Sequence, residues 1–171
     1  MAEQIGNNLY RLDIPLPDSP LRNLNSYLIT GERNLLIDTG FRQEACREAM
    51  REQLNQIGVD MDRTDLFLTH LHTDHTGLVQ ELLRPSCRAM ISEVDLPLLV
   101  HSQSEAYWEE NFAAYLQEGF PQAELTALWG TNPAKSIHPE PFTGYTPVAP
   151  GTVLRYGGYA LRCIHTPGHT P

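Results

Sequence analysis

The 171 residues are enough for one domain with a buried core, and the 41% hydrophobic and 19% charged shares are ordinary for a soluble globular protein. The net charge of −9 would repel phosphate backbones, so general nucleic-acid binding is not expected. Met1–Tyr10 lacks the basic and apolar regions of a secretory signal, and no apolar run is long enough to cross a membrane.

The three cysteines are Cys46, Cys87 and Cys163. They are widely spaced and odd in number, which indicates neither a disulfide framework nor a CxxC metal site. We therefore expect a cytoplasmic protein with reduced thiols, acting on a small molecule rather than on nucleic acid or a membrane.

In chain order, the first elements alternate between strand and turn patterns. Leu9–Ile14 alternates apolar and polar residues and predicts a strand, while Ser26–Thr30 and Asn34–Asp38 predict a hairpin. Apolar residues at helical spacing from Phe41 to Ile57, followed by Gly58, predict a helix.

The next elements are a strand over Asp65–Thr69, a helix over Thr76–Arg84 that ends before Pro85, and a strand over Arg88–Ser92. From Glu93 to about Trp129 the pattern is helical, with breaks expected at Pro97 and at Gly119–Pro121.

Five prolines make the stretch from Pro133 to Pro150 an expected irregular connection. Val153–Tyr156 and Tyr159–Ile164, joined by two glycines, predict a hairpin. Strands and helices in this order indicate a layered α/β domain over residues 1–171, with an insertion over about 93–147 that separates two strand-rich blocks.

The most informative segment is His70-Leu71-His72-Thr73-Asp74-His75, at the end of a predicted strand. Side chains two residues apart in a strand face the same side, so His70, His72 and Asp74 are expected to converge, and the turn into the following helix can re-aim His75. One metal ion needs only two histidines and one further ligand. The surplus aspartate and histidine therefore indicate a second ion, and zinc, iron, manganese, cobalt or nickel all suit such ligands.

His169 follows a predicted strand in a Pro-Gly turn, where its imidazole can stay accessible and complete the first ion's ligands with His70 and His72. Structural alternatives remain for each of these residues. Asp74 could cap the helix that starts at Thr76, and the histidines could be ordinary surface or core residues. The isolated histidines, His101, His138 and His165, are interpreted as structural or surface residues.

These motifs resemble those of the metallo-β-lactamase superfamily. His70, His72, Asp74 and His75 match its HxHxDH signature, Asp38-Thr39-Gly40 matches its early Asp-Thr-Gly, and Thr166–His169 matches the turn with its third histidine. The resemblance extends over nearly the whole chain and implies an αββα sandwich, of which this sequence covers the N-terminal half or somewhat more.

The resemblance implies that His70, His72 and His169 hold a first divalent ion, and that Asp74 and His75 hold a second. Zinc is the expected metal, with iron or manganese as alternatives. Asp38 would orient the ligand segment, or alternatively cap the helix from Phe41.

The family's bridging aspartate and last histidine are absent from this sequence, which ends at Pro171. Half a sandwich would expose the inner face of its sheet. We therefore expect a fragment, incomplete at its C-terminus, whose sheet is covered by a missing C-terminal half or by a second copy in a homodimer.

The implied activity is hydrolysis by a metal-bound hydroxide, with Asp74 binding one ion and orienting the hydroxide or accepting a proton. The Thr-Pro-Gly-His-Thr run resembles the glyoxalase II-like and lactonase-like branches, which favours an ester, thioester or lactone substrate. The alternatives are a phosphodiesterase or RNA-processing nuclease, a mononuclear iron sulfur dioxygenase, and a catalytically incomplete metal-binding fragment.

An apolar stripe follows one helix of the insertion through Tyr107, Trp108 and Phe112, and continues to Tyr115 and Leu116. It either packs the insertion against the domain or a second copy, or lines a lid over an acyl pocket.

Overall fold

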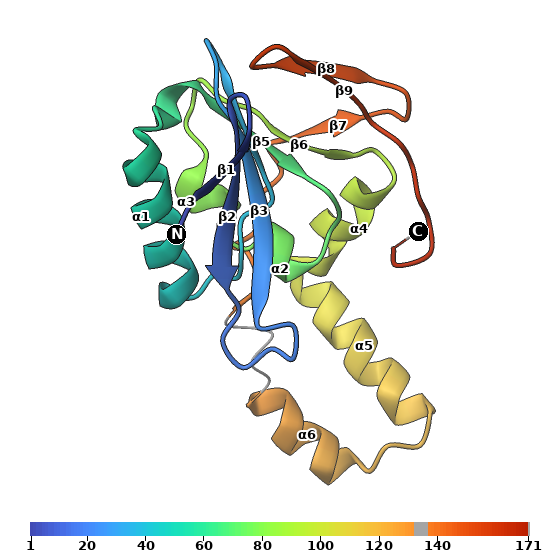
Figure 1. Cartoon of the computed structure of the whole chain (residues 1–171). Coiled ribbons are helices and arrows are strands. Elements are labelled where there is room, and N and C mark those ends of the chain that lie inside the picture. Colours follow the sequence, from blue (N-terminus) through green and yellow to red (C-terminus); the bar gives the residue numbers. More distant parts are fainter. Residues whose placement is uncertain (132–136, 171) are drawn as a thin grey trace.

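A computed structural model describes residues 1–131 and 137–170. Its centre is a seven-stranded sheet in which the strands follow one another in sequence order (Figure 1). Of the six pairs of neighbouring strands, the first three are antiparallel and the last three are parallel. The strands are β1 (Glu3–Gly6), β2 (Leu9–Pro15), β3 (Asn23–Ile29), β4 (Asn34–Ile37), β5 (Thr64–Leu68), β6 (Ala89–Ser92) and β7 (Tyr145–Val148).

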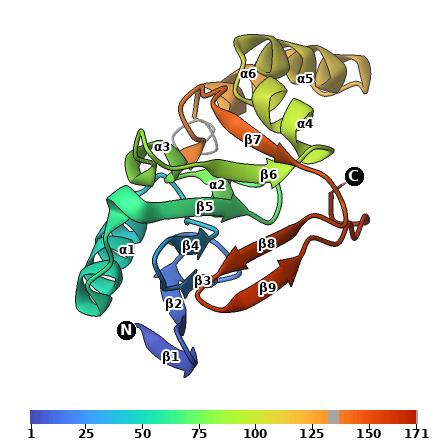
Figure 2. The ribbon, with the colours of Figure 1, turned by 90° about the horizontal axis from the view of Figure 1, so that it is seen from above.

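Helices cover one face of this sheet, and a β-hairpin lies over the other (Figure 2). The period-two alternation of the strands explains both layers, because neighbouring residues of a strand point to opposite faces. In β4, Leu36 joins the core beneath the helices, whereas Leu35 joins a second core with Met90 and Tyr156 beneath the hairpin. The expected layered α/β fold is confirmed.

Helix α1 (Glu44–Ile57) packs Cys46, Met50 and Leu54 into the main core, and Gly58 ends it in a left-handed conformation. The helix begins three residues later than Phe41, and its N-cap is Gln43. The alternative assignment of Asp38 as the cap of this helix is therefore wrong.

The single helix predicted over Thr76–Arg84 is replaced by two short helices, α2 (Thr73–Thr76) and α3 (Val79–Leu82). The interruption has a clear cause. The N–H of Leu78 donates to Oγ1 of Thr39 at 3.2 Å, while the carbonyl of Asp74 accepts from the N–H of Gly40 at 2.9 Å. The loop after β4 therefore uses hydrogen-bonding groups that a continuous helix would pair internally.

The prediction of an irregular connection over Pro133–Pro150 is wrong where β7 forms. This strand pairs parallel with β6, and Pro147 lies opposite Ile91. Because β7 is the last strand of the sheet, a proline that donates no hydrogen bond is tolerated there. Pro133 lies outside the described residues.

In the described part of the connection between β6 and β7, the chain forms the helices α4 (Asp95–Ser102), α5 (Glu105–Gln117) and α6 (Gln122–Gly130). The break at Gly119–Pro121 is confirmed, but Pro97 lies inside the first turn of α4, where proline is compatible with a helix. Figure 1 shows α5 and α6 extending away from the sheet. Trp129 of α6 contacts Trp108, Phe112 and Tyr115 edge-on, so the aromatic stripe holds α5 against α6.

The predicted hairpin is confirmed as β8 (Val153–Tyr156) and β9 (Tyr159–Arg162). A buried ionic cluster ties it to the sheet. The carboxylate of Asp65 is fully buried and accepts hydrogen bonds from Arg33, Arg88 and the hydroxyl of Tyr156. Among the described helices, none is long and apolar enough to cross a membrane.

Candidate metal centre

The candidate ligands gather at the carboxyl end of the parallel strands. Residues 70–75 leave β5 and lead into α2, and the loop 38–40 leaves the neighbouring strand β4. Carboxyl ends of parallel strands are where α/β folds bind ligands, because the chain there turns outward and presents side chains at one edge.

Asp38 joins the two loops. Its Oδ1 accepts from the backbone N–H of Thr69 at 2.8 Å, and its Oδ2 lies 2.8 Å from both Oγ1 of Thr69 and Nδ1 of His75. The residue has a φ of 60°, a left-handed conformation that aspartate adopts more readily than most residues. Asp38 therefore fixes both the start and the end of the ligand segment.

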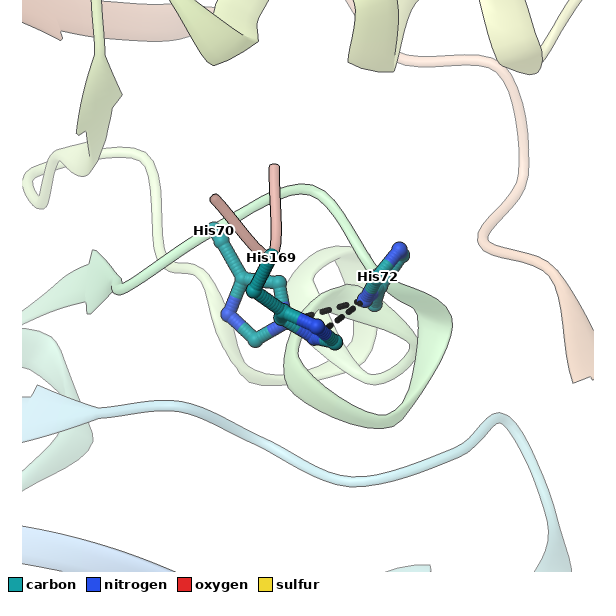
Figure 3. A group of neighbouring side chains, drawn as sticks. All are labelled: His70, His72 and His169. Atoms are coloured by element: carbon teal, nitrogen blue, oxygen red, sulfur yellow. Dashed lines mark hydrogen bonds between the residues drawn. The ribbon is translucent and has the colours of Figure 1, made fainter. Parts of the chain in front are cut away.

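The imidazoles of His70, His72 and His169 point toward one another (Figure 3). Nδ1 of His72 lies 3.1 Å from Nε2 of His70 and 3.0 Å from Nε2 of His169. The two partners His72 and His169 come from segments 97 residues apart in the sequence, so the turn after β9 completes the group. Within the described residues, these three form the one group of His, Cys, Asp or Glu close enough to share an ion.

The donor set fits a metal ion. Two nitrogens bound to one tetrahedral zinc lie about 3.3 Å apart, because each Zn–N bond is about 2.0–2.1 Å. The observed separations are close to that value. A neutral imidazole has only one proton, which cannot satisfy three facing nitrogens, whereas a cation can accept all three lone pairs.

Asp74 and His75 form a second pair beside the first group. Oδ2 of Asp74 lies 3.3 Å from Nε2 of His75, and both side chains are largely buried. Because Asp38 binds Nδ1 of His75, the other ring nitrogen is directed to Asp74. Asp74 lies within α2, whose N-cap is His72, so it does not cap a helix that begins at Thr76.

The two sets differ electrostatically. Burial, together with the neighbouring histidines, lowers the pKa of His70 to about 4, so this imidazole is neutral at pH 7 and can act as a ligand. Burial also opposes the charged form of His75, but hydrogen bonds to Asp38 and Asp74 outweigh it and raise the pKa of His75 to about 9. The carboxylates of Asp38 and Asp74 therefore favour a positive charge at His75, which is a proton in the metal-free protein and would be replaced by a bound cation.

The three aromatic residues predicted to line the substrate pocket lie elsewhere. Trp108 and Phe112 line a cavity with Trp129 and His138, and this cavity shares no described residue with the one beside the metal candidates. Tyr107 instead contacts His101 edge-on. This arrangement does not support the lid interpretation, because the rings of Trp108 and Phe112 contact Trp129, and Trp108 also contacts His138, away from the candidate ligands.

Two residues beside the histidines were missed by the sequence analysis. Ser92 and Asp95 line a cavity of about 200 Å³ together with His70 and His169. Ser92 is the last residue of β6 and Asp95 follows that strand, so their position depends on the parallel pairing of β6 with β5, which is not evident locally. His165 lies at the same cavity, on an exposed segment.

Comparisons with known proteins agree with this geometry. Residues 20–86 match the family model described as the metallo-beta-lactamase superfamily, a span that includes Asp38 and the segment 70–75. A protein named atrochrysone carboxyl ACP thioesterase from Aspergillus fumigatus is 26% identical over 155 residues, covering 90% of this chain and 26% of the relative. A second protein of that name, nsrC from Aspergillus novofumigatus, is 43% identical over 65 residues, or 37% of this chain and 20% of the relative.

Among solved structures, a metallo-beta-lactamase family protein from Thermus thermophilus superposes with a TM-score of 0.76 at 28% identity, covering 98% of this chain and 54% of that one. The metallo-beta-lactamase GOB-18 from Elizabethkingia meningoseptica shares the fold, with a TM-score of 0.65 at 21% identity, covering 99% and 52%. The chain thus spans about half the length of these structures. The family-model match over residues 20–86 and the fold shared along nearly the whole chain show a metallo-β-lactamase superfamily domain.

Proposed function

We propose that the protein is a metal-dependent hydrolase of ester-like bonds, with thioesters as its main substrates. The observation that carries the proposal is the convergence of three imidazole nitrogens on one point, beside the Asp74–His75 pair. The three imidazoles and the adjacent Asp74–His75 pair are suited to bind one divalent ion each, and we propose zinc for both.

In this proposal, His70, His72 and His169 hold the first ion, while Asp74 and His75 contribute to the second. A zinc ion held by these residues would supply a water molecule with its pKa lowered to ~7 and would polarise the substrate carbonyl. The chain's own residues orient these groups. Asp38 keeps Nε2 of His75 directed toward the site, and Asp74, at its edge, can accept a proton from the attacking water.

Thioesters are preferred over other ester-like bonds because relatives matched along most of the chain are named as carboxyl ACP thioesterases. No nucleophilic serine or cysteine is needed, because the attacking group is water. The absence of a described Lys or Arg beside the histidine cavity disfavours a phosphodiester substrate.

The remaining ligands of the second ion would come from outside the described residues. The cavity of about 370 Å³ between sheet and hairpin is lined by apolar side chains such as Ile37, Phe67 and Leu161, and Ile164 beside it is 74% exposed. We propose that a further part of the protein, or a second copy, covers this face and completes the site.

The test is metal analysis and kinetics on the full-length protein. We expect two zinc ions per chain, and faster hydrolysis of an acyl thioester than of the matched oxoester, a lactone or bis(p-nitrophenyl) phosphate. His72→Ala should lower kcat/KM by roughly 100-fold or more, because it removes a ligand. His101→Ala is the matched control, since His101 pairs with Glu110 away from the site. Preferential phosphodiester cleavage, or a protein that binds no metal, would contradict the proposal.

A further inference from the structure

A second large cavity lies at the helical extension formed by α5 and α6. Its volume is about 860 Å³, which is within the range of cavities that hold small organic ligands. In Figure 1, α5 leads away from the domain and α6 turns back toward it. The cavity is lined by residues of both helices, by Arg42 before α1, and by the segment 138–141 that precedes β7.

Four of the lining residues carry aromatic rings that meet edge to face. The ring of Trp108 lies at 77° to the rings of both Trp129 and His138, with centroid distances of 6.1 and 5.9 Å. Phe112 meets Trp129 at 74° and 5.3 Å. All four residues are only partly buried, so the packing of α5 against α6 does not cover them completely. Rings at such steep angles can present several π faces to one bound group, as in the aromatic cages that bind quaternary ammonium ions.

The charged side chains at this cavity favour a cation. Glu105, Glu109 and Glu140 line it, and Arg42 is the one basic side chain among its described lining residues. Arg42 forms an ion pair with Glu140. Within the described part of the chain, neither Glu105 nor Glu109 forms an ion pair. The cavity therefore keeps an excess of negative charge.

Two other features of the cavity do not reverse this preference. The positive end of the α5 dipole lies here, because Ser104 caps the helix, but Glu105 in the first turn offsets it. Burial lowers the pKa of His138, so its ring is neutral at pH 7 and does not act as a competing cation. The remaining negative charge is that of Glu109, one turn further along α5.

We propose that this cavity binds a small organic cation, whose quaternary ammonium group lies against the ring faces of Trp108 and Trp129 and is attracted by Glu109. The negative face of an aromatic ring attracts such a group, and the methyl groups on the nitrogen bury apolar surface at the same time. The cavity shares no described residue with the one beside the candidate metal ligands, so the proposal does not depend on a bound metal.

The test uses choline as the probe, titrated into the full-length protein by calorimetry at constant ionic strength. The control ligand is 3,3-dimethyl-1-butanol, which has the same shape but carries a carbon in place of the charged nitrogen. We expect choline to bind roughly 10-fold more tightly than this alcohol. Choline should bind equally well with and without zinc, so a failure of this proposal is distinct from a failure of the proposed function.

Variants of the cavity separate the aromatic contribution from the charge. Trp108→Leu should weaken choline binding by roughly 10-fold, because the ring face is lost, and Trp108→Phe should retain most of the affinity. Glu109→Gln should weaken binding by roughly 3-fold. Glu118→Gln is the matched control, since it removes an exposed carboxylate at the end of α5 that does not line the cavity. Its choline affinity should equal that of the wild type.

Several outcomes would overturn the proposal. These are no binding of choline, equal binding of choline and the alcohol, equal losses in Glu109→Gln and Glu118→Gln, or wild-type affinity in a folded Trp108→Leu. If circular dichroism shows that Trp108→Leu does not fold, the two glutamate variants and the ligand pair decide. Phosphatidylcholine vesicles test a lipid headgroup as the source of the cation, and sedimentation of the protein with them would overturn the assignment to a small molecule.

Discussion

Oδ2 of Asp38 lies 2.8 Å from Nδ1 of His75, and this contact joins the loop after β4 to the ligand segment after β5. The same carboxylate binds both the N–H and the hydroxyl of Thr69. The side chain of Asp38 therefore fixes the positions of Thr69 and His75 at the two ends of the ligand segment, and it also fixes the tautomer of His75. Hydrogen bonds between Thr39 and the carbonyl of His75 strengthen the same junction.

Asp38→Asn should weaken metal binding at Asp74 and His75 by roughly 10- to 100-fold, because an amide cannot accept three hydrogen bonds as the carboxylate does. Asparagine tolerates a φ of 60°, so the backbone should be unaffected. The measurement is zinc content and affinity of the full-length protein. Asp18→Asn is the matched control, since Asp18 also has a φ of 60° but lies outside the site. Equal losses in both variants would assign the effect to the backbone rather than to His75.

Thr39→Val should lower the free energy of unfolding by about 1–3 kcal/mol, because the buried N–H of Leu78 loses its acceptor while the side-chain volume is kept. Urea unfolding measures this change. Thr126→Val is the control: its hydroxyl bonds within α6 on an exposed face, so little change is expected. If both variants have the same stability, the Thr39–Leu78 hydrogen bond does not stabilise the junction.

Local patterns were sufficient for most of the sheet and for the ligand segment. Alternation and turn residues predicted β2, β3, β4, β5, β6 and the β8–β9 hairpin, because these signals lie within each strand. The convergence of His70 and His72 likewise follows from their spacing at a strand end.

Features that depend on distant partners were not predictable in this way. The break between α2 and α3 arises from hydrogen bonds to residues 39 and 40, which belong to a different loop. Strand β7 contains Pro147 and was interpreted as irregular, since its role as an edge strand depends on pairing with β6. Asp95 was missed for the same reason: its proximity to the histidines requires β5 and β6 to be neighbours.

Gly77→Ala tests how closely the two loops must approach. A Cβ at this position would lie 2.6 Å from both the carbonyl oxygen of Gly40 and the backbone nitrogen of Arg42, and neither atom can rotate away. We expect a loss of about 1–3 kcal/mol in the free energy of unfolding, together with weaker zinc binding as the ligand segment shifts.

Gly130→Ala is the matched control for this substitution, because it places the same methyl group on α6 with nothing within 4 Å. Its stability should be unchanged or slightly higher, since alanine favours a helix. Wild-type stability and zinc affinity in Gly77→Ala would mean that the loop and α2 can separate without cost to the site.

The acid stability of the protein should depend on Asp65. Burial alone would raise the pKa of this carboxyl, but hydrogen bonds from Arg33, Tyr156 and Arg88 outweigh that effect and hold the pKa well below its usual range. A carboxyl whose pKa is lower in the folded state stabilises the fold above its unfolded pKa of about 3.9, and this contribution is lost as the pH falls toward the folded pKa.

Asp65→Asn should therefore be less stable than the wild type by about 3 kcal/mol at pH 7, since both arginines lose a buried partner but remain partly exposed. Urea unfolding at pH 7 and at pH 3 should show this difference narrowing at the lower pH. Asp62→Asn removes a carboxylate that is 80% exposed and should change stability little at either pH. A difference between Asp65→Asn and wild type that stays constant with pH would mean that lost packing, rather than the charge of Asp65, causes the destabilisation.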